Sequence, residues 1–380
     1  MLKTIRSRAA VIAAPVLTII ACVSLSPPRG STTGNVPTVR VGLQPGSRQM
    51  VRILLGTLSD SDQSPATRPS GGEAFVTFGG KHYRGELTVS PSDSGRLVVN
   101  TLSMDDYLRG VVPLEIGNRT AAEFAAVQAQ AVAARTYAYK NLHPSRAFDM
   151  YATVQDQVYG GVDAEKPQSD SAIATTSDVL VLYNGQPIVT PYHSTCGGST
   201  AAVTEVWYSQ SDEPYLRPVS DRIPGTDHYY CDPSPRFSWT QDFDGAALRA
   251  VMEKYLSAYT NAPKTGLGRI TDIREAGRTP SGRVAALIVE TESGSYTLRG
   301  NDVRFVLRNA TGATLNSTFF TFSEQKSGGE VSSLVINGRG YGHGIGMCQW
   351  GAIGRARAGQ NFRTILETYY PGTTIGRIAG

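Results

Sequence analysis

The chain has 380 residues, of which 40% are hydrophobic and 18% charged, with 40 glycines and 21 prolines, a composition typical of a folded, loop-rich protein of one large or two ordinary domains. The formal net charge is +4, and it falls to +1 if residues 1–21 are removed, because that segment holds three basic residues and no acidic one. So small a basic excess argues against nucleic acid as a partner.

The N-terminal segment predicts an exported lipoprotein. Three basic residues precede an apolar run from Ala9 to Ala21, and the sequence "IIAC", which ends at Cys22, resembles the box at which bacterial lipoproteins are cut and lipidated. The alternative is a transmembrane anchor, but the run is shorter than the roughly 20 residues that span a bilayer. We therefore interpret residues 1–21 as a lipoprotein signal peptide, Cys22 as the lipidated first residue and residues 22–36 as a flexible tether to the cell envelope membrane.

The next part predicts strands followed by a strong helix. From Pro37 to Leu108, short alternating segments separated by turn residues are typical of antiparallel strands. The segment "DYLRGVVPLEIGNRT" then delivers one carboxylate, Glu115, to what we expect to be a loop. Thr120 and Glu123 form a T-x-x-E capping box ahead of "FAAVQAQAVAARTYAYKNL", which predicts the clearest helix of the protein.

The remaining elements predict an α+β fold. Strand-like "DVLVLYNGQPIVTPYHS" and a hairpin in "GRVAALIVETESGSYTLRG" are followed by "LVINGRG", a strand that leads into a glycine-dense loop, and by a final helix from about Ala352 to Tyr369. We expect short mixed β-sheets, one long central helix, and two lobes that form a substrate groove. The expected divisions are an N-terminal part of the catalytic domain (37–237), an inserted β-rich lobe (238–329) and a C-terminal part of the catalytic domain (330–380).

Glu115 is the first candidate for chemistry. Its sequence neighbours, "VVPL" before it and Ile116 after it, are apolar, and burial raises the pKa of a glutamate because it disfavours the charged form. A glutamate that is neutral near pH 7 can serve as a general acid. The local pattern alone favours the alternative, a carboxylate that caps the following helix or interacts with its dipole.

A second constellation predicts either a metal site or a disulfide. His193 and Cys196 have H-x2-C spacing, and His228 and Cys231 repeat it, which gives two nitrogens and two sulfurs, a set suited to tetrahedral Zn²⁺. The alternative is a Cys196–Cys231 disulfide, which an exported location favours. Besides Cys22, the chain has three cysteines, so that at least one, Cys348 on this alternative, stays without an intrachain partner.

The third constellation is "GRGYGHGIGMCQWGA". Its five glycines between Gly338 and Gly346 let the backbone approach a ligand closely, while His343 and Gln349, with the aromatic rings of Tyr341 and Trp350, suit a sugar. The alternative is a tight β-bulge loop around a buried histidine.

Taken together, the motifs resemble the stage II sporulation protein D family of bacterial cell-wall proteins. The matching segments occur in family order between about Thr77 and Ile375, and they are "YRGELTV", "DYLRGVVPLEIG", "AVQAQAVAARTYA", "QVYGG", "HSTCGGST" with "EVW", "PYLRPV", "GRGYGHGIGMCQWGA" and "ILETYYPGTTI". This chain departs from members that carry "HSTSGG", where serine stands at the position of Cys196, so that metal binding is not a constant of the family.

The resemblance implies a lytic transglycosylase that cleaves the MurNAc–GlcNAc bond of peptidoglycan glycan strands, denuded of their stem peptides, to leave 1,6-anhydro-MurNAc ends. It maps the catalytic acid, which then acts as the base, to Glu115. We expect Arg135, Gln157, Tyr159, His343 and Gln349 to bind the saccharide. The family also includes amidase enhancers, which implies as the alternative a non-catalytic glycan-binding module whose partner is an N-acetylmuramoyl-L-alanine amidase.

Overall fold

The structure is a computed structural model that describes residues 36, 38–39, 43–70 and 74–379. The predicted signal peptide, the lipidation site Cys22 and all of the predicted tether except Val36 lie outside the described residues. Within the described part of the chain, no helix has both the length and the apolar character needed to cross a bilayer.

The described chain folds into helices and several small sheets, which confirms the predicted α+β class. The strands are β1 (Thr38–Val39), β2 (Met50–Leu58), β3 (Val76–Phe78), β4 (Lys81–Tyr83), β5 (Glu86–Ser92), β6 (Gly95–Ser103), β7 (Met150–Tyr151), β8 (Val179–Tyr183), β9 (Gln186–Pro187), β10 (Tyr192–His193), β11 (Ser238–Asp244), β12 (Ile270–Glu275), β13 (Ala286–Thr291), β14 (Gly294–Arg299), β15 (Phe320–Ser327), β16 (Glu330–Arg339), β17 (Met347–Cys348) and β18 (Thr374–Ile378). The helices are α1 (Met104–Ile116), α2 (Phe124–Lys140), α3 (Pro167–Thr175), α4 (Val203–Val206), α5 (Gly245–Tyr255), α6 (Asp302–Val306), α7 (Gln349–Arg357) and α8 (Phe362–Tyr369), with short 3-10 turns at Ala121–Glu123, Val162–Ala164 and Leu256–Ala258.

Helix α1 corrects the prediction of a loop around Glu115. It begins directly after β6, in the sheet ordered β5-β6-β2-β7, and Glu115 lies in its last turn. Ser103 caps the start, because its hydroxyl accepts a hydrogen bond from the Asp106 N–H (3.2 Å) and donates one to the Asp106 carboxylate (2.9 Å). The helix ends at Gly117, whose positive φ of 72° suits glycine and whose N–H donates to the Pro113 carbonyl.

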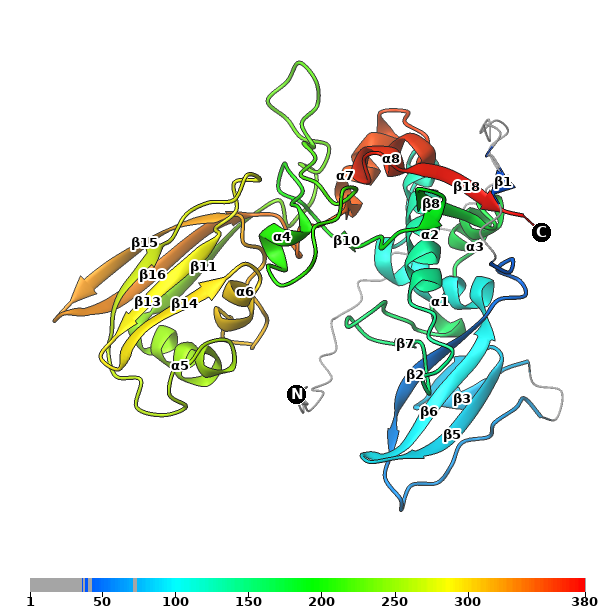
Figure 1. Cartoon of the computed structure of the whole chain (residues 1–380), viewed down its shortest axis with the longest axis horizontal. Coiled ribbons are helices and arrows are strands. Elements are labelled where there is room, and N and C mark those ends of the chain that lie inside the picture. Colours follow the sequence, from blue (N-terminus) through cyan, green and yellow to red (C-terminus); the bar gives the residue numbers. More distant parts are fainter. Residues whose placement is uncertain (1–35, 37, 40–42, 71–73, 380) are drawn as a thin grey trace. The chain divides into compact units, whose positions relative to one another are not determined.

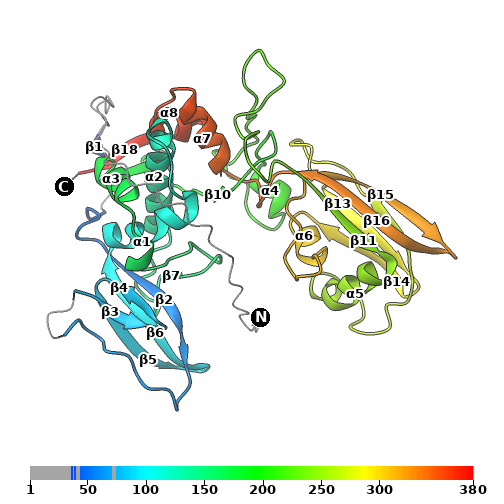
Figure 2. The same ribbon diagram turned by 180° about the vertical axis from the view of Figure 1, so that it is seen from behind.

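Helix α2 confirms the predicted central helix. Glu123 accepts from the Thr120 N–H (2.8 Å), as the capping box requires, and Phe124 begins the helix proper. Almost all of its turns are buried, and its many alanines let other elements approach closely. Figures 1 and 2 both show α1 and α3 beside α2, which also contacts α7, α8 and β8. The main hydrophobic core therefore forms around α2.

Two pairings join distant segments beside this core. The sheet β1-β18-β8-β9 brings the C-terminal strand between β1 and β8. The short strands β10 and β17 pair in parallel, with Tyr192 opposite Met347 and His193 opposite Cys348. This second pairing holds the "YHSTCGG" segment against the "GMCQWGA" segment.

A second hydrophobic core extends from Phe243 to Ile336. It combines the sheets β11-β16-β15 and β12-β13-β14 with α5 and α6, and the β13–β14 hairpin is the one predicted from the sequence. Strand β16 pairs with both β11 and β15, so that residues assigned to the C-terminal part of the catalytic domain belong to this second group of sheets. The domain boundaries and the two lobes with a groove stay predictions.

The single final helix predicted from about Ala352 to Tyr369 is wrong, because the chain forms two helices, α7 and α8, there. Gly359, with a φ of 82°, leaves the helical region, and Asn361 begins the second helix by accepting from the Thr364 N–H (3.0 Å).

Candidate active site

Glu115 is half-buried, with its carboxylate held by groups from three other segments. Tyr107, Leu108, Val111 and Val112 turn the apolar face of α1 into the core, and Glu115 follows Val111 by four residues on the same face. Its Oε1 accepts a hydrogen bond from the Val158 N–H (3.2 Å), and it also has side-chain hydrogen bonds with Tyr192 and Gln349.

The environment shifts the acidity of Glu115 in the direction a general acid needs. Burial raises the pKa of Glu115 above its ordinary value, and it outweighs the hydrogen bonds from Val158, Gln349 and Tyr192, which lower that pKa because they stabilise the carboxylate. The carboxyl group therefore holds its proton at a higher pH than an exposed glutamate does.

A directional chain of hydrogen bonds leads to Glu115. The Tyr107 hydroxyl donates to Gln157 Oε1 (3.1 Å), which turns the amide nitrogen of Gln157 toward Tyr192, and this Nε2 donates to the Tyr192 hydroxyl (2.9 Å). Because the oxygen of Tyr192 accepts from Gln157, its own O–H is free to donate to Glu115. Burial and the charge of Glu115 raise the pKa of Tyr192 well above its ordinary value, so that it remains a donor.

Gln349 approaches Glu115 from the other side. It is the first residue of α7, it is nearly buried, and its Nε2 donates to Gln130 Oε1 of α2 (3.2 Å). An amide nitrogen carries two hydrogens, so that the same group can also donate to the Glu115 carboxylate. Two of the five predicted saccharide-binding residues, Gln157 and Gln349, thus belong to the surroundings of Glu115.

His343 supports this site through the main chain. Its Nδ1 accepts from the Ile345 N–H (3.0 Å) and its Nε2 donates to the Tyr192 carbonyl (2.9 Å), so that both ring nitrogens have partners. Burial lowers the pKa of His343 well below its ordinary value, which keeps the ring neutral. These contacts fit the alternative of a buried loop histidine, and they fix the backbone at Tyr192.

Arg135 and Tyr159 have structural partners. The fully buried guanidinium of Arg135 donates to the carbonyls of Ile173 (3.1 Å) and Thr176 (2.8 Å) at the end of α3. The Tyr159 hydroxyl donates to Asn100 Oδ1 (3.0 Å), and its ring packs against Tyr107. The structure does not bring these two side chains to Glu115, although both were predicted to bind saccharide.

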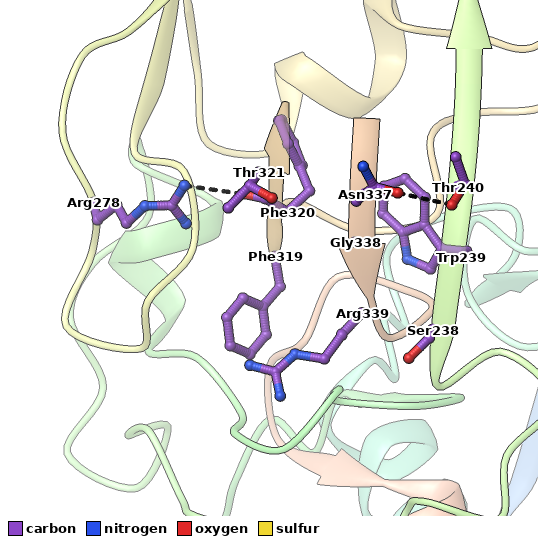
Figure 3. Close-up of a pocket in the computed structure, with 10 residues that line it drawn as sticks. All are labelled: Ser238, Trp239, Thr240, Arg278, Phe319, Phe320, Thr321, Asn337, Gly338 and Arg339. Carbon is purple, nitrogen blue, oxygen red and sulfur yellow. Dashed lines mark hydrogen bonds between the residues drawn. The ribbon is translucent and has the colours of Figure 1, made fainter. Parts of the chain in front are cut away.

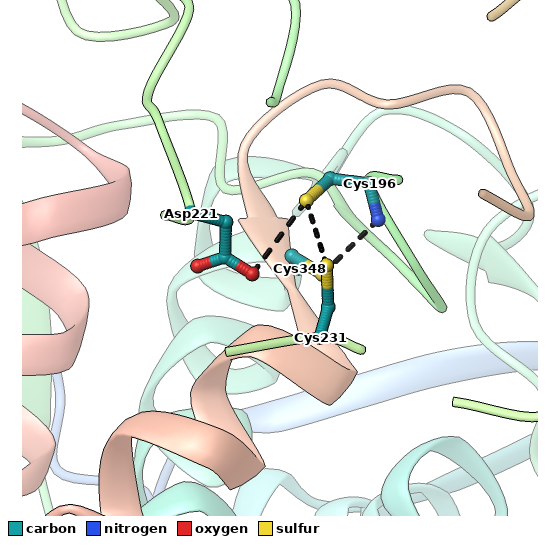
Figure 4. A group of neighbouring side chains, drawn as sticks. All are labelled: Cys196, Asp221, Cys231 and Cys348. Carbon is teal, nitrogen blue, oxygen red and sulfur yellow. Dashed lines mark hydrogen bonds between the residues drawn. The ribbon is translucent and has the colours of Figure 1, made fainter. Parts of the chain in front are cut away.

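A thiol cluster lies near the same strand pair. Cys196, Cys231 and Cys348 are buried, and their sulfurs and a carboxylate oxygen of buried Asp221 all lie within 4.8 Å of one another. Figure 4 shows the four side chains pointing toward a common centre. The Sγ atoms of Cys196 and Cys231 are 3.5 Å apart, far beyond the roughly 2.05 Å of a disulfide. These residues could hold a metal ion, and Cys196 and Cys231 are not bonded to each other.

The structure brings together only part of the predicted metal site. The side chain of His228 is 78% exposed to solvent. Its Nδ1 lies 3.1 Å from the carboxylate of Asp232. His193 is buried, its Nδ1 hydrogen-bonds with the Ile345 carbonyl (3.1 Å), and its buried Nε2 has no hydrogen-bond partner. Asp221 and Cys348 lie beside Cys196 and Cys231 in place of the two predicted histidine ligands.

Two of the cavities in the described chain have volumes above 500 Å³. One of about 590 Å³ offers aromatic faces, hydroxyl groups and two arginines but no carboxyl group, so that it cannot supply a general acid (Figure 3). Its lining residues are Ser238, Trp239, Thr240, Arg278, Phe319, Phe320, Thr321, Asn337, Gly338 and Arg339. The other, of about 550 Å³, includes Pro191 and Trp207. Glu115 lines neither cavity.

Three residues of these sites, Tyr192, Gln130 and Asp221, were not predicted from the sequence. Tyr192 directly precedes the recognised "HSTC" segment, and β alternation places it on the opposite face from His193. This alternation could have been used to predict that Tyr192 faces away from His193. Gln130 and Asp221 carry no local signal, because only the packing of α7 against α2 and the loop after Ser220 bring them to these positions.

Comparisons with known proteins agree with the motifs. A family model described as stage II sporulation protein matches residues 92–183, and a domain of unknown function matches residues 223–346. An uncharacterized protein of Brachyspira hyodysenteriae is 31% identical over 302 residues, which are 79% of this chain and 73% of that protein. The amidase enhancer of Bacillus subtilis is 32% identical over 70% of this chain, although the match covers 40% of that relative. The stage II sporulation protein D of Bacillus subtilis is 28% identical over 73% of this chain and 75% of the relative.

Proposed function

The chain belongs to the stage II sporulation protein D family, and from that premise we propose that it is a peptidoglycan lytic transglycosylase that acts on denuded glycan strands. The observation that carries the proposal is Glu115, a half-buried carboxyl group with a raised pKa and three hydrogen-bond donors around it. It lies within the segment that matches the family model.

The chemistry needs one carboxyl group. Protonated Glu115 gives its proton to the glycosidic oxygen as the bond to C1 of MurNAc breaks, and the resulting carboxylate takes the proton of the C6 hydroxyl as that oxygen attacks C1. The products are a free GlcNAc 4-hydroxyl and a 1,6-anhydro-MurNAc end, and Glu115 is protonated again. The C6 hydroxyl belongs to the same sugar, so that the attack is intramolecular and needs no activated water.

The neighbours of Glu115 stabilise the charged state between these two steps. The Val158 N–H and the side chains of Tyr192 and Gln349 stabilise the carboxylate form of Glu115 by hydrogen bonding. Such donors are in place before the reaction, which lowers the cost of developing charge. Burial favours the acid before bond cleavage, and the donors favour the carboxylate after it.

For sugar contacts we propose the surface next to Gln349. Trp350 follows Gln349 and remains partly exposed, and the guanidinium of Arg119 lies 5.3 Å from the centre of its ring. Leu114, beside Glu115, is 48% exposed. An aromatic face, a cation and an exposed apolar side chain beside the acid suit a sugar ring that carries a lactyl carboxylate.

The direct test is cleavage of denuded glycan by the purified full chain, with separation of the products by chromatography. Wild type should release anhydro-ended fragments. Glu115→Gln should lose about 10²- to 10⁴-fold of the rate, the usual contribution of a general acid. The matched control is Glu367→Gln, because Glu367 is an exposed carboxylate on α8 and its loss should leave the rate unchanged. Equal rates for Glu115→Gln and wild type would exclude the assigned role.

The second candidate is a glycan-binding module that raises the activity of an amidase. A relative at 32% identity bears the name amidase enhancer, and Glu115 lines neither of the two cavities. On this view the chain binds denuded glycan without cutting it and accelerates an N-acetylmuramoyl-L-alanine amidase. Stimulation of an amidase by both wild type and Glu115→Gln, with no anhydro product from either, would favour this function.

We propose export with a lipid on Cys22, so that Cys22→Ala should move the protein from the membrane fraction to the soluble fraction of the envelope. For the metal we propose Zn²⁺, because three thiols and one carboxylate are ligands that Zn²⁺ accepts in a tetrahedral site.

A further inference from the structure

We propose that Cys196, Asp221, Cys231 and Cys348 form one closed structural zinc site that clamps β10 to β17 and thereby sets the positions of Tyr192 and Gln349. This ligand set differs from the two H-x2-C pairs that the sequence suggested. The role of the clamp in catalysis rests on the proposed function, whereas the metal site itself does not.

Two of the separations among the four ligand atoms match those of a tetrahedral zinc site, and all four atoms lie within 4.8 Å of one another. With Zn–S of about 2.3 Å and Zn–O of about 2.0 Å, tetrahedral geometry separates two sulfurs by about 3.8 Å and a sulfur from an oxygen by about 3.5 Å. The Sγ atoms of Cys196 and Cys231 are 3.5 Å apart, and Cys196 Sγ lies 3.6 Å from Asp221 Oδ2. These separations are close to those of a zinc site and unlike those of a disulfide.

The carboxylate of Asp221 is oriented for one metal bond. Its Oδ1 accepts from the Tyr369 hydroxyl (2.7 Å) and pairs with the Arg355 guanidinium (3.2 Å), which leaves Oδ2 directed at the thiols. Such outer partners are what orient ligands in metal sites. The absence of a side chain at Gly351 is also required, since a Cβ there would collide with the Asp221 carboxylate and the Tyr369 hydroxyl.

Main-chain N–H groups point at two of the sulfurs. Cys196 Sγ accepts from the Gly198 N–H (3.4 Å), and Cys348 Sγ accepts from the N–H groups of Cys196 (3.1 Å) and Gly351 (3.2 Å). Donors of this kind favour the thiolate, which is the form that binds metal.

Two buried arginines offset the charge of the site. Three thiolates and a carboxylate bring four negative charges, of which a divalent cation neutralises two. Arg355 pairs with Asp221, and Arg283, which is 1% exposed, hydrogen-bonds with the carbonyls of Cys196 (3.2 Å) and Ser199 (2.8 Å). Burying Arg283 beside neutral thiols would cost more than burying it beside a thiolate site.

The strand pairing explains how the site reaches Glu115. In the parallel pair, His193 and Cys348 share one face and Tyr192 and Met347 share the other. Cys348 therefore faces the cluster on one side of the pair, while Tyr192 contacts Glu115 on the other. Gln349 immediately follows Cys348, so that fixing this cysteine also fixes the start of α7. The buried ligands leave no side open to solvent, which is typical of structural zinc sites.

The first test is elemental analysis of the full chain purified without added metal. We expect one zinc per chain, and Cys348→Ser and Asp221→Asn should each lower zinc occupancy at least tenfold in the presence of a competing chelator. His228→Ala is the matched control, because this exposed histidine lies outside the cluster and should leave occupancy unchanged.

Three results would overturn the site. They are iron in place of zinc, a Cys196–Cys231 disulfide found by mass spectrometry in metal-free protein, and zinc that survives Asp221→Asn but is lost on His193→Ala. The last of these would make His193, whose buried Nε2 has no hydrogen-bond partner, the fourth ligand.

The second test follows the clamp itself by hydrogen exchange before and after zinc removal. The N–H of Met347 donates to the Pro191 carbonyl (3.2 Å) and that of Trp350 to the Ser194 carbonyl (3.0 Å). Both amides should exchange at least tenfold faster without zinc, while the β13–β14 hairpin, in the second core, should not change. Unchanged exchange at Met347 and Trp350 would show that the metal does not hold these strands. Both tests are read without glycan, so that they stand even if Glu115 proves not to be catalytic.

Discussion

Replacing Tyr192 by phenylalanine should move the pH dependence of Glu115 upward. The Tyr192 hydroxyl donates to the Glu115 carboxylate, which stabilises the charged form and lowers the pKa of Glu115. Without that donor the pKa should rise further. A general acid works only while protonated, so that activity is lost as the pH rises through this pKa, and in Tyr192→Phe the loss should occur at higher pH.

The size of the shift follows from the contact that is removed. A hydrogen bond to a charged group contributes about 1.5–3 kcal/mol, and one pKa unit corresponds to 1.36 kcal/mol, so that the shift should be about 1 to 2 units. The lower end is expected, because the Val158 N–H and Gln349 still act on the carboxylate. Gln157 Nε2 also loses its acceptor, which should lower the free energy of unfolding by about 1 kcal/mol.

The assay is an NMR titration of carboxyl-labelled glutamate, in which the signal of Glu115 is identified by its absence from Glu115→Gln. It is run beside the pH profile of glycan cleavage. Tyr139→Phe is the control, because its hydroxyl donates to the Gln44 carbonyl (2.6 Å) and does not contact Glu115. An unchanged or lowered pKa of Glu115 in Tyr192→Phe would refute the assigned hydrogen-bond chain.

Three further substitutions test other parts of the account. Ser103→Ala should lower the free energy of unfolding by about 1 kcal/mol in urea denaturation, because α1 loses its N-terminal cap, and an unchanged midpoint would contradict this. Arg135→Met should cost about 2–4 kcal/mol, because buried carbonyls at the end of α3 lose their donors; a stable variant with weakened glycan binding would restore Arg135 to the saccharide site. Gly351→Ala should lower zinc occupancy in elemental analysis, since the added methyl group meets Asp221, whereas full occupancy would remove Asp221 from the ligand set.

Local sequence signals were sufficient to predict elements whose residues alone determine their secondary structure. The capping box at Thr120 and the alanine-rich run predicted α2, and the alternation around Ala286–Arg299 predicted the β13–β14 hairpin. The same kind of signal was present but not used at Ser103 and Asp106, where a cap one turn ahead of Tyr107 marks the start of α1. Glu115 was predicted to lie in a loop, yet α1 continues through Pro113 to Ile116.

The site required long-range contacts that no local pattern contains. The motif around Glu115 and the motif around Gln349 were both recognised, but their meeting depends on the packing of α7 against α2. In the thiol cluster, spacing alone paired each histidine with its cysteine, although His228 is exposed to solvent and tertiary packing brings Asp221 and Cys348 to Cys196 and Cys231 instead. Equal spacing in sequence therefore did not mean equal placement in space.

The most direct measurement of the central claim is cleavage of denuded glycan in water enriched in oxygen-18. If Glu115 recovers the proton of the C6 hydroxyl, the new MurNAc ends carry no label and are lighter by one water than hydrolysed ends, and Glu115→Gln yields almost none of them. Labelled reducing ends would show that water is the nucleophile, and unlabelled ends formed equally by Glu115→Gln would show that another group transfers the proton.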